Sequence, residues 1–390
     1  MFSENPGSCY NSCEVSLTYG NKGYIMTNLV KTLVAGAVLS ASAVAMAAED
    51  AVLHIYNWSD YIAEDTIANF EKETGIKVVY DVYDSNEMLD AKLLSGNSGF
   101  DLVVPSDFFL GRQIAAKIHQ PLNKELLGNY ANLDEQLLKV VSTVDPGNAY
   151  AVPYMWGTNG IGYNPEKVKA ALGENAPVDS WDLVFKPENM EKLASCGVAF
   201  LDSPTEIMAA ALAYIGKDPN SEEKDDYEAA KEMMLKVRPF VKYFHSSQFI
   251  NDLANGEICV AVGYSGDILQ AAARAEEAKN GVTVEYRIPK EGAQMWVDSL
   301  VIPADAKHAE NAHKFIDFVL RPEVVAGITN YVMYANPNAK ATELVDEAVK
   351  TNAGIYPSEE VKAKLFMVTP RSAKIERIIT RTWTTIQTNR

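Results

Sequence analysis

The sequence predicts an α/β fold on two observations: short apolar runs alternate with helix-like segments, and the apolar runs end in turn residues. Strands are expected at 52–56, 76–82 and 100–105. Helices are expected at 62–72, which a glycine follows closely, and at 85–94. Short apolar runs between helices are typical of buried parallel strands. The first third of the chain therefore has the pattern of a sheet covered by helices.

The same alternation returns later in the chain. Strands are expected at 197–201 and 258–262, each followed by an alanine-rich helix. A length of 390 residues suggests about two domains, and no internal repeat or low-complexity linker separates them. We therefore expect two lobes joined by short crossing strands. The expected division is 48–155 with 281–340 for lobe 1, and 156–280 with 341–390 for lobe 2.

The N-terminal segment is typical of a secretory signal peptide. The uncharged run 32–48 follows Lys31 and ends in small residues, and 45–47 matches the A-x-A cleavage pattern. The run is shorter than the ~20 residues that a membrane-spanning helix needs. We expect 1–47 to be a leader, with the true start at Met26 and 1–25 outside the reading frame. The predicted product is periplasmic and is not embedded in a membrane.

Composition narrows the class of partner. The net charge is −17, with 47% hydrophobic and 22% charged residues, which is typical of a globular protein. Binding to nucleic acid requires a basic face, so this balance argues against a nucleic-acid partner. An acidic protein is compatible with a cationic ligand, although many proteins are acidic for solubility alone.

Four cysteines divide between the two parts of the chain. Cys9 and Cys13 lie in the expected leader, and Cys196 and Cys259 lie in the expected mature protein. An even pair in an oxidising compartment favours one disulfide bond. The alternative is two buried free thiols.

Aromatic and acidic residues recur where the expected strands end, which is where α/β sheets bind their ligands. Carboxylates accept hydrogen bonds from an ammonium group, and aromatic faces attract cations. Each residue also has a plain structural alternative, as a helix cap or a core aromatic. Together they suit an aliphatic polyamine. The candidates are Trp58, Ser59, Asp60, Tyr61, Ser106, Glu206, Tyr264 and Asp267, with Trp296 and Asp298 on one face of an extended segment.

Several stretches of the chain resemble the bacterial periplasmic polyamine-binding proteins, the substrate-binding subunits of ABC importers for putrescine and spermidine. They include 53–62, which contains Asn-Trp-Ser-Asp-Tyr, together with 70–78, 99–106 and 153–164. The resemblance covers nearly the whole expected mature chain and is strongest to the putrescine-binding branch. It implies a type II solute-binding fold, with two lobes that each contain a mixed sheet flanked by helices and that close on the ligand. It also implies a monomer that delivers its ligand to a membrane permease.

The resemblance also implies roles for individual residues. Asp60, Glu206, Asp267 and Asp298 would anchor ammonium groups, Ser59 and Ser106 would add polar contacts, and Trp58, Tyr61, Tyr264, Trp296 and Tyr334 would form aromatic walls. Relatives often carry tryptophan in place of Tyr264. At Trp296, putrescine binders resemble phenylalanine and spermidine binders more often show tryptophan, and Phe108 adds bulk where small residues also occur. These differences leave the preferred polyamine open.

Other classes of function are weaker alternatives. A secreted hydrolase could use paired carboxylates, but Gly-Tyr-Ser-Gly-Asp at 263–267 misses the G-x-S-x-G pattern. The five histidines show no zinc motif, since His308 and His313 are five positions apart. We therefore expect no catalytic residue, metal or cofactor. A binder of another small solute, or a sensor without a transport role, remain alternatives.

Overall fold

The computed structural model describes residues 49–388 and has the predicted α/β architecture. Its strands are β1 (Val52–Trp58), β2 (Lys77–Tyr83), β3 (Leu102–Val103), β4 (Ala151–Tyr163), β5 (Val198–Phe200), β6 (Tyr243–Phe244), β7 (Val260–Tyr264), β8 (Glu285–Arg287) and β9 (Met295–Val301). The predicted signal peptide and start site fall on residues outside this range, so they stay predictions.

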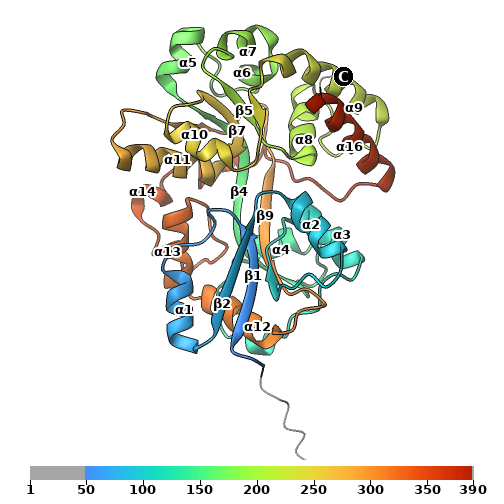
Figure 1. The fold of residues 1–390 in the computed structure, drawn as a ribbon, viewed down its shortest axis with the longest axis vertical. Coiled ribbons are helices and arrows are strands. Elements are labelled where there is room, and N and C mark those ends of the chain that lie inside the picture. The colour runs from blue at the N-terminus through green and yellow to red at the C-terminus, as the bar shows by residue number, and fades with distance from the viewer. Residues whose placement is uncertain (1–48, 389–390) are drawn as a thin grey trace, which may run out of the picture. The chain divides into compact units, whose positions relative to one another are not determined.

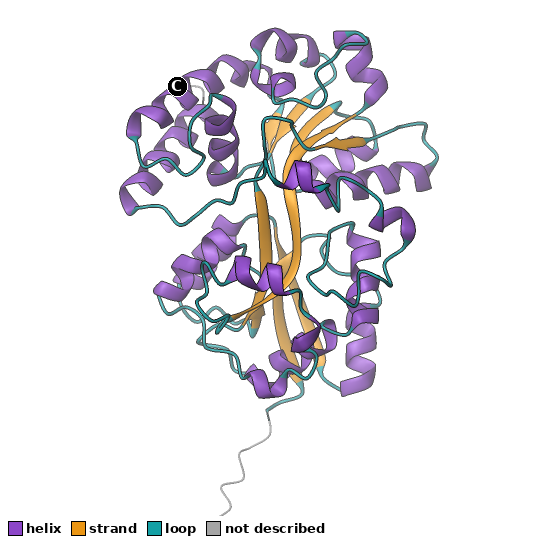
Figure 2. Ribbon diagram, turned by 180° about the vertical axis from the view of Figure 1, so that it is seen from behind, coloured by secondary structure: helices purple, strands orange, loops and turns teal. Residues whose placement is uncertain are grey.

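Helices separate most of these strands in the chain. They are α1 (Thr66–Thr74), α2 (Asn86–Leu94), α3 (Asp107–Ala115), α4 (Glu135–Val141), α5 (Pro165–Leu172), α6 (Asp182–Phe185), α7 (Pro187–Leu193), α8 (Pro204–Tyr214), α9 (Lys224–Val237), α10 (Gln248–Ala254), α11 (Ser265–Ala278), α12 (Ala309–Val319), α13 (Pro322–Val332), α14 (Glu347–Lys350), α15 (Glu359–Lys362) and α16 (Ala373–Thr388). Short 3₁₀ turns lie at Lys124–Leu126, Tyr130–Asn132 and Arg238–Phe240. In Figure 2, helices lie on both sides of the strands. Among residues 49–388, no helix has the length and apolar character that a membrane crossing requires.

The strands form a mixed sheet in the order β2-β1-β3-β9-β4-β7-β5-β6, with β8 paired to β4. β1 is parallel to β2 and β3, and β5 is parallel to β6 and β7. The long strand β4 pairs antiparallel with β9 over Ala151–Thr158 and with β7 over Asn159–Tyr163. It therefore connects the group that contains β1 to the group that contains β7 (Figure 1). The residue division between two lobes remains a prediction.

Burial explains why the first elements form where they do. Leu53 and Ile55 alternate with partly exposed neighbours along β1 and point into the core, as expected for one face of a strand. In α1, Phe70 packs against Phe315 of α12, with ring centroids 5.0 Å apart. Gly75 ends α1 with a left-handed φ of 72°, which glycine adopts without a Cβ clash. The helix begins at Thr66 rather than at the predicted residue 62.

The predicted disulfide bond is present. Cys196 and Cys259 are bonded, with their Cα atoms 5.4 Å apart. They lie just before the adjacent parallel strands β5 and β7, so the bond ties together the entry points of these strands. β7 ends at Tyr264, which lines the cavity described next.

Candidate functional site

One cavity brings together all the residues predicted for the ligand site except Asp60. Its walls come from the ends of β1 and β7, from β9, and from the first turns of α8 and α11. The lining residues are Trp58, Ser59, Tyr61, Asp84, Ser106, Glu206, Ser246, Ser247, Tyr264, Asp267, Trp296, Asp298 and Tyr334.

Five aromatic side chains contact one another in sequence around the cavity. The Trp58 ring lies 6.0 Å from Tyr264, and Tyr264 lies 5.9 Å from Trp296 between centroids. Trp296 lies 5.4 Å from Tyr334, which lies 5.0 Å from Tyr61. Since such contacts restrict each ring, the aromatic wall is held in place before any ligand arrives.

Hydrogen bonds orient the Glu206 carboxylate, which lies in the first turn of α8. Its Oε2 accepts from the Tyr264 hydroxyl at 2.8 Å, and its Oε1 accepts from Asn159 Nδ2 at 3.0 Å. The Asn159 side chain is oriented in turn, because its Oδ1 accepts from the Trp296 indole at 2.9 Å. Tyr264 therefore orients Glu206 directly, and Trp296 orients it through the side-chain amide of Asn159.

Two of the cavity aspartates, Asp267 and Asp298, are likewise oriented by hydrogen bonds from uncharged hydroxyl groups. Asp267 lies in the first turn of α11, and its Oδ1 accepts from the Tyr334 hydroxyl at 2.7 Å. Asp298 in β9 accepts from the Ser106 hydroxyl at 2.6 Å. Trp296 and Asp298 are two positions apart on β9, and both line the cavity, as the extended-segment argument predicts.

Burial raises the pKa values of these carboxyl groups. The pKa of Asp267 rises to about 7 and that of Asp298 to about 8, in both cases mainly through desolvation. Desolvation also raises the pKa of Glu206. Because a buried carboxylate without a counter-charge is costly, the site favours either a bound proton or a bound cation at each acid.

Two further buried acids, Glu87 and Asp107, interact electrostatically with Glu206 of the lining. The pKa of Glu87 rises to about 8 and that of Asp107 to about 7, mainly through burial and in smaller part through the charge of Glu206. Their carboxylate oxygens have no hydrogen-bond partner among the described residues. The described residues that line the cavity include four acids but no lysine or arginine. The site is therefore chemically suited to a cation.

Asp60 differs from the other predicted site residues. Its side chain is exposed and does not line the cavity. Its backbone adopts a φ of 55°, and its Oδ1 accepts from Arg274 Nη2 of α11 at 2.5 Å. The structure thus pairs this carboxylate with a cation of the chain itself, and its predicted contact with a ligand stays a prediction.

Three lining residues were missed by the sequence reasoning. Asp84 follows β2, and Ser246 and Ser247 follow β6. The search of strand ends left out these two strands. Applied to every expected strand, the same rule would have included Asp84, which lies two residues beyond the expected strand 76–82.

Comparison with known proteins identifies the family. The family model described as bacterial extracellular solute-binding protein matches residues 65–357. The chain belongs to this family. It is 59% identical to the putrescine-binding periplasmic protein PotF of Escherichia coli, over 92% of this chain and 97% of that protein. It is 58% identical to the putrescine-binding periplasmic protein SpuD of Pseudomonas aeruginosa, over 94% of this chain and all of that protein.

A solved structure supports the same assignment. The spermidine/putrescine ABC transporter substrate-binding protein PotD of Streptococcus pneumoniae superposes with a TM-score of 0.69 at 28% identity, covering 86% of this chain and 98% of that one. The predicted type II solute-binding fold and the predicted resemblance to polyamine-binding proteins are thereby confirmed. The chain is therefore a substrate-binding subunit of the kind that serves ABC importers.

Proposed function

We propose that this solute-binding protein captures putrescine, or a diamine of similar length, in the acidic and aromatic cavity. The observation that carries the proposal is the charge of the lining: the described residues that form it include the acids Asp84, Glu206, Asp267 and Asp298 and no lysine or arginine. A dication offsets the cost of ionising the buried acids, because each ammonium group supplies donors to a carboxylate that desolvation otherwise keeps protonated. An anionic solute would meet only repulsion.

The aromatic wall suits the remainder of such a ligand. A methylene chain between two ammonium groups gains roughly 0.8 kcal/mol for each CH₂ that it buries. A ring face near an ammonium adds roughly 0.5–2 kcal/mol. The restricted rings of Trp58, Trp296 and Tyr334 supply such surfaces without a large loss of side-chain freedom on binding.

Similarity supports putrescine over longer polyamines. Two relatives named for putrescine share 58–59% of their residues with this chain, whereas relatives named for both spermidine and putrescine share 34–35%. We therefore infer that binding falls as the ligand lengthens beyond a diamine.

The proposed role is binding and delivery, without a chemical reaction. The protein would work as a monomer in the periplasm and would present the loaded form to the transmembrane subunits of its importer. In this role the ligand should be recovered chemically unchanged after incubation with the protein. A ligand that binds both walls of the cavity would favour a closed state by its greater affinity for that state.

Titration calorimetry on the exported protein tests the proposal. Putrescine, cadaverine, agmatine and spermidine form the series, and 1-aminobutane and 1,4-butanediol are controls that remove one or both charges. Putrescine is expected to bind at least a hundredfold more tightly than 1-aminobutane, and butanediol is expected not to bind. Equal affinity for putrescine and 1-aminobutane would overturn the proposal of two ammonium contacts.

A further inference from the structure

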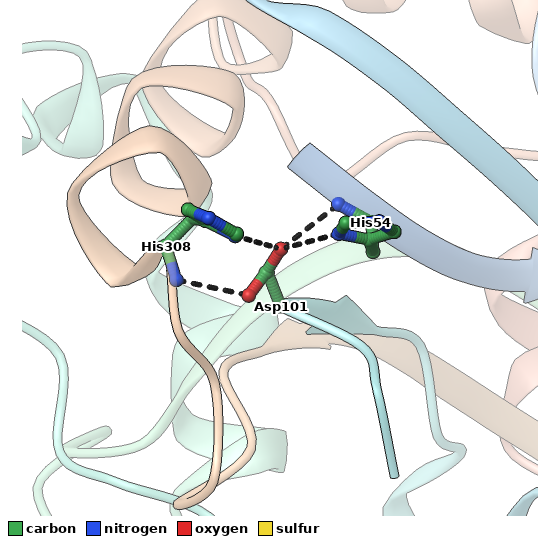
Figure 3. Close-up of side chains that lie close together, drawn as sticks. All are labelled: His54, Asp101 and His308. Atoms are coloured by element: carbon green, nitrogen blue, oxygen red, sulfur yellow. Dashed lines mark hydrogen bonds and ion pairs between the residues drawn. The ribbon is translucent and has the colours of Figure 1, made fainter. Parts of the chain in front are cut away.

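A second cavity lies beside two histidines and an aspartate that come from separate parts of the chain (Figure 3). His54 lies in β1, Asp101 directly precedes β3, and His308 is the residue before α12. The second cavity is lined by all three of these residues. It shares no lining residue with the acidic and aromatic cavity, so the proposed polyamine site does not account for it.

The three side chains converge on one carboxylate oxygen. Asp101 Oδ2 lies 3.2 Å from His54 Nδ1 and 2.9 Å from His308 Nδ1. All three atoms lie within 4.8 Å of one another. A metal ion with bonds of ~2.1 Å to nitrogen and oxygen places neighbouring ligand atoms about 3.0–3.4 Å apart. The separation of 3.2 Å to His54 falls within this range, and that of 2.9 Å to His308 lies just below it, so the three atoms are near the spacing of ligands on one ion.

The backbone holds the shared carboxylate in position. Asp101 Oδ1 accepts from the N–H groups of Lys307 and His308, at 2.9 Å each. Asp101 Oδ2 accepts from the N–H of His54, also at 2.9 Å. Only 3% of the Asp101 side chain is exposed, compared with 12% for His308 and 34% for His54. The carboxylate is therefore fixed, and the imidazoles can be reached by an ion.

We propose that His54, Asp101 and His308 form a binding site for a divalent transition-metal ion such as zinc. Two imidazoles and one carboxylate suit Zn²⁺, Ni²⁺ or Cu²⁺, whereas Ca²⁺ and Mg²⁺ prefer ligand sets made of oxygen alone. Three protein ligands leave further coordination positions for water or a small solute in the cavity. The cavity is also lined by Asp305 and Lys307, whose charges cancel.

The sequence argument missed this site because it looked for short spacings. His54 and His308 are far apart in the chain, and the pairing of β1 with β3 and the position of α12 bring them to one carboxylate. Without a metal, the same contacts join the start of α12 to β1 as hydrogen bonds. The experiment therefore has to distinguish metal binding from a purely structural role of these hydrogen bonds.

Calorimetric titration with ZnCl₂ tests the proposal on the tag-free exported protein. One ion per protein is expected, with the affinity lowered at least tenfold by His308→Asn and by His54→Gln. His245→Asn is the control, since it removes a partly exposed histidine outside the cluster and is expected to leave zinc affinity unchanged. Asp101→Asn is avoided because Asp101 bonds to three backbone N–H groups and its loss endangers folding.

Copper provides an independent readout of the ligands. The electron paramagnetic resonance spectrum of the Cu²⁺-loaded protein is expected to show two nitrogen ligands, and each histidine variant is expected to lose one. Thermal unfolding confirms that the variants fold. Zinc affinity that is the same in the wild type and in the double variant His54→Gln/His308→Asn would overturn the proposal and leave only structural hydrogen bonds. Putrescine binding of the His54 and His308 variants is measured in parallel and is expected to be unaffected, since neither residue lines the acidic and aromatic cavity.

Discussion

The Tyr334 hydroxyl donates a hydrogen bond of 2.7 Å to the Asp267 carboxylate, and it accepts one of 3.1 Å from the Asp267 N–H. The two residues are 67 positions apart in the chain and meet only in the fold. This pair joins an aromatic wall residue to an acid at the first turn of α11. It therefore couples the two kinds of group from which the proposed polyamine site is built.

Asp267→Asn is expected to weaken putrescine binding at least tenfold at pH 8. The variant keeps an oxygen that can accept from Tyr334, but it removes the charge that would pair with an ammonium, and a hydrogen bond to a charged group contributes roughly 1.5–3 kcal/mol. Titration calorimetry measures the effect. An unchanged affinity would remove Asp267 from the site.

Tyr334→Phe is expected to weaken putrescine binding at pH 7 and to have a smaller effect at pH 8.5. The Tyr334 hydrogen bond lowers the pKa of Asp267, so its loss raises that pKa and leaves more of the carboxyl protonated at pH 7. Tyr331→Phe is the control, because that hydroxyl bonds to Glu64 on the surface, away from the cavity. A loss of affinity that does not depend on pH would contradict this account.

Asp298→Asn is expected to abolish tight putrescine binding and yet to stabilise the ligand-free protein above pH 8. Because the folded pKa of about 8 lies above the ordinary value of 3.8, protonation stabilises the folded state at low pH, and this contribution is lost as pH rises toward 8. The amide avoids this loss. The melting temperature of the variant relative to wild type should be higher at pH 8.5 than at pH 5.5; the opposite order would contradict burial as the cause.

Gly266→Ala is expected to weaken putrescine binding at least tenfold. A Cβ atom at this position would lie 2.4 Å from Cδ2 and Cε2 of Tyr334, so the ring would have to move. Gly327→Ala is the matched control within α13, since a Cβ atom there meets nothing within 4 Å. Equal affinity in the two variants would show that the position of Tyr334 is unimportant for binding.

Replacing both Cys196 and Cys259 by serine is expected to lower stability by about 4 kcal/mol, because the bond closes a loop of 63 residues in the unfolded chain. Urea unfolding measures this change. Putrescine affinity should stay within about twofold, since neither cysteine lines the cavity. A stability change below about 1 kcal/mol would indicate that the unfolded chain is already compact here.

Much of the fold could be predicted because strand and helix periodicities differ. Leu53 and Ile55 alternate with half-buried neighbours, and Gly75 ends α1 in a conformation that favours glycine. The start of α1 could not be placed as well. The apolar residues follow a helical spacing from residue 62 onward, but the residues before Thr66 form a turn. The helix itself begins after Asp65.

The site was predictable to the extent that it follows strand ends. Trp296 and Asp298 share a face of β9, as alternation requires. Asp60 also follows a strand, but its left-handed backbone and the partner Arg274 depend on contacts between distant segments. The buried state of Glu87 likewise arises from packing, which residue spacing does not reveal.

The central claim is that the ligand's ammonium groups take the place of protons on buried acids. Calorimetry of putrescine binding at pH 6.5, in two buffers with different ionisation enthalpies, counts the protons directly. Since the pKa values of Asp267 and Asp298 are about 7 and 8, we predict release of about one to two protons per putrescine at pH 6.5, falling toward zero at pH 9. Tight binding at pH 6.5 without any proton release would contradict the account.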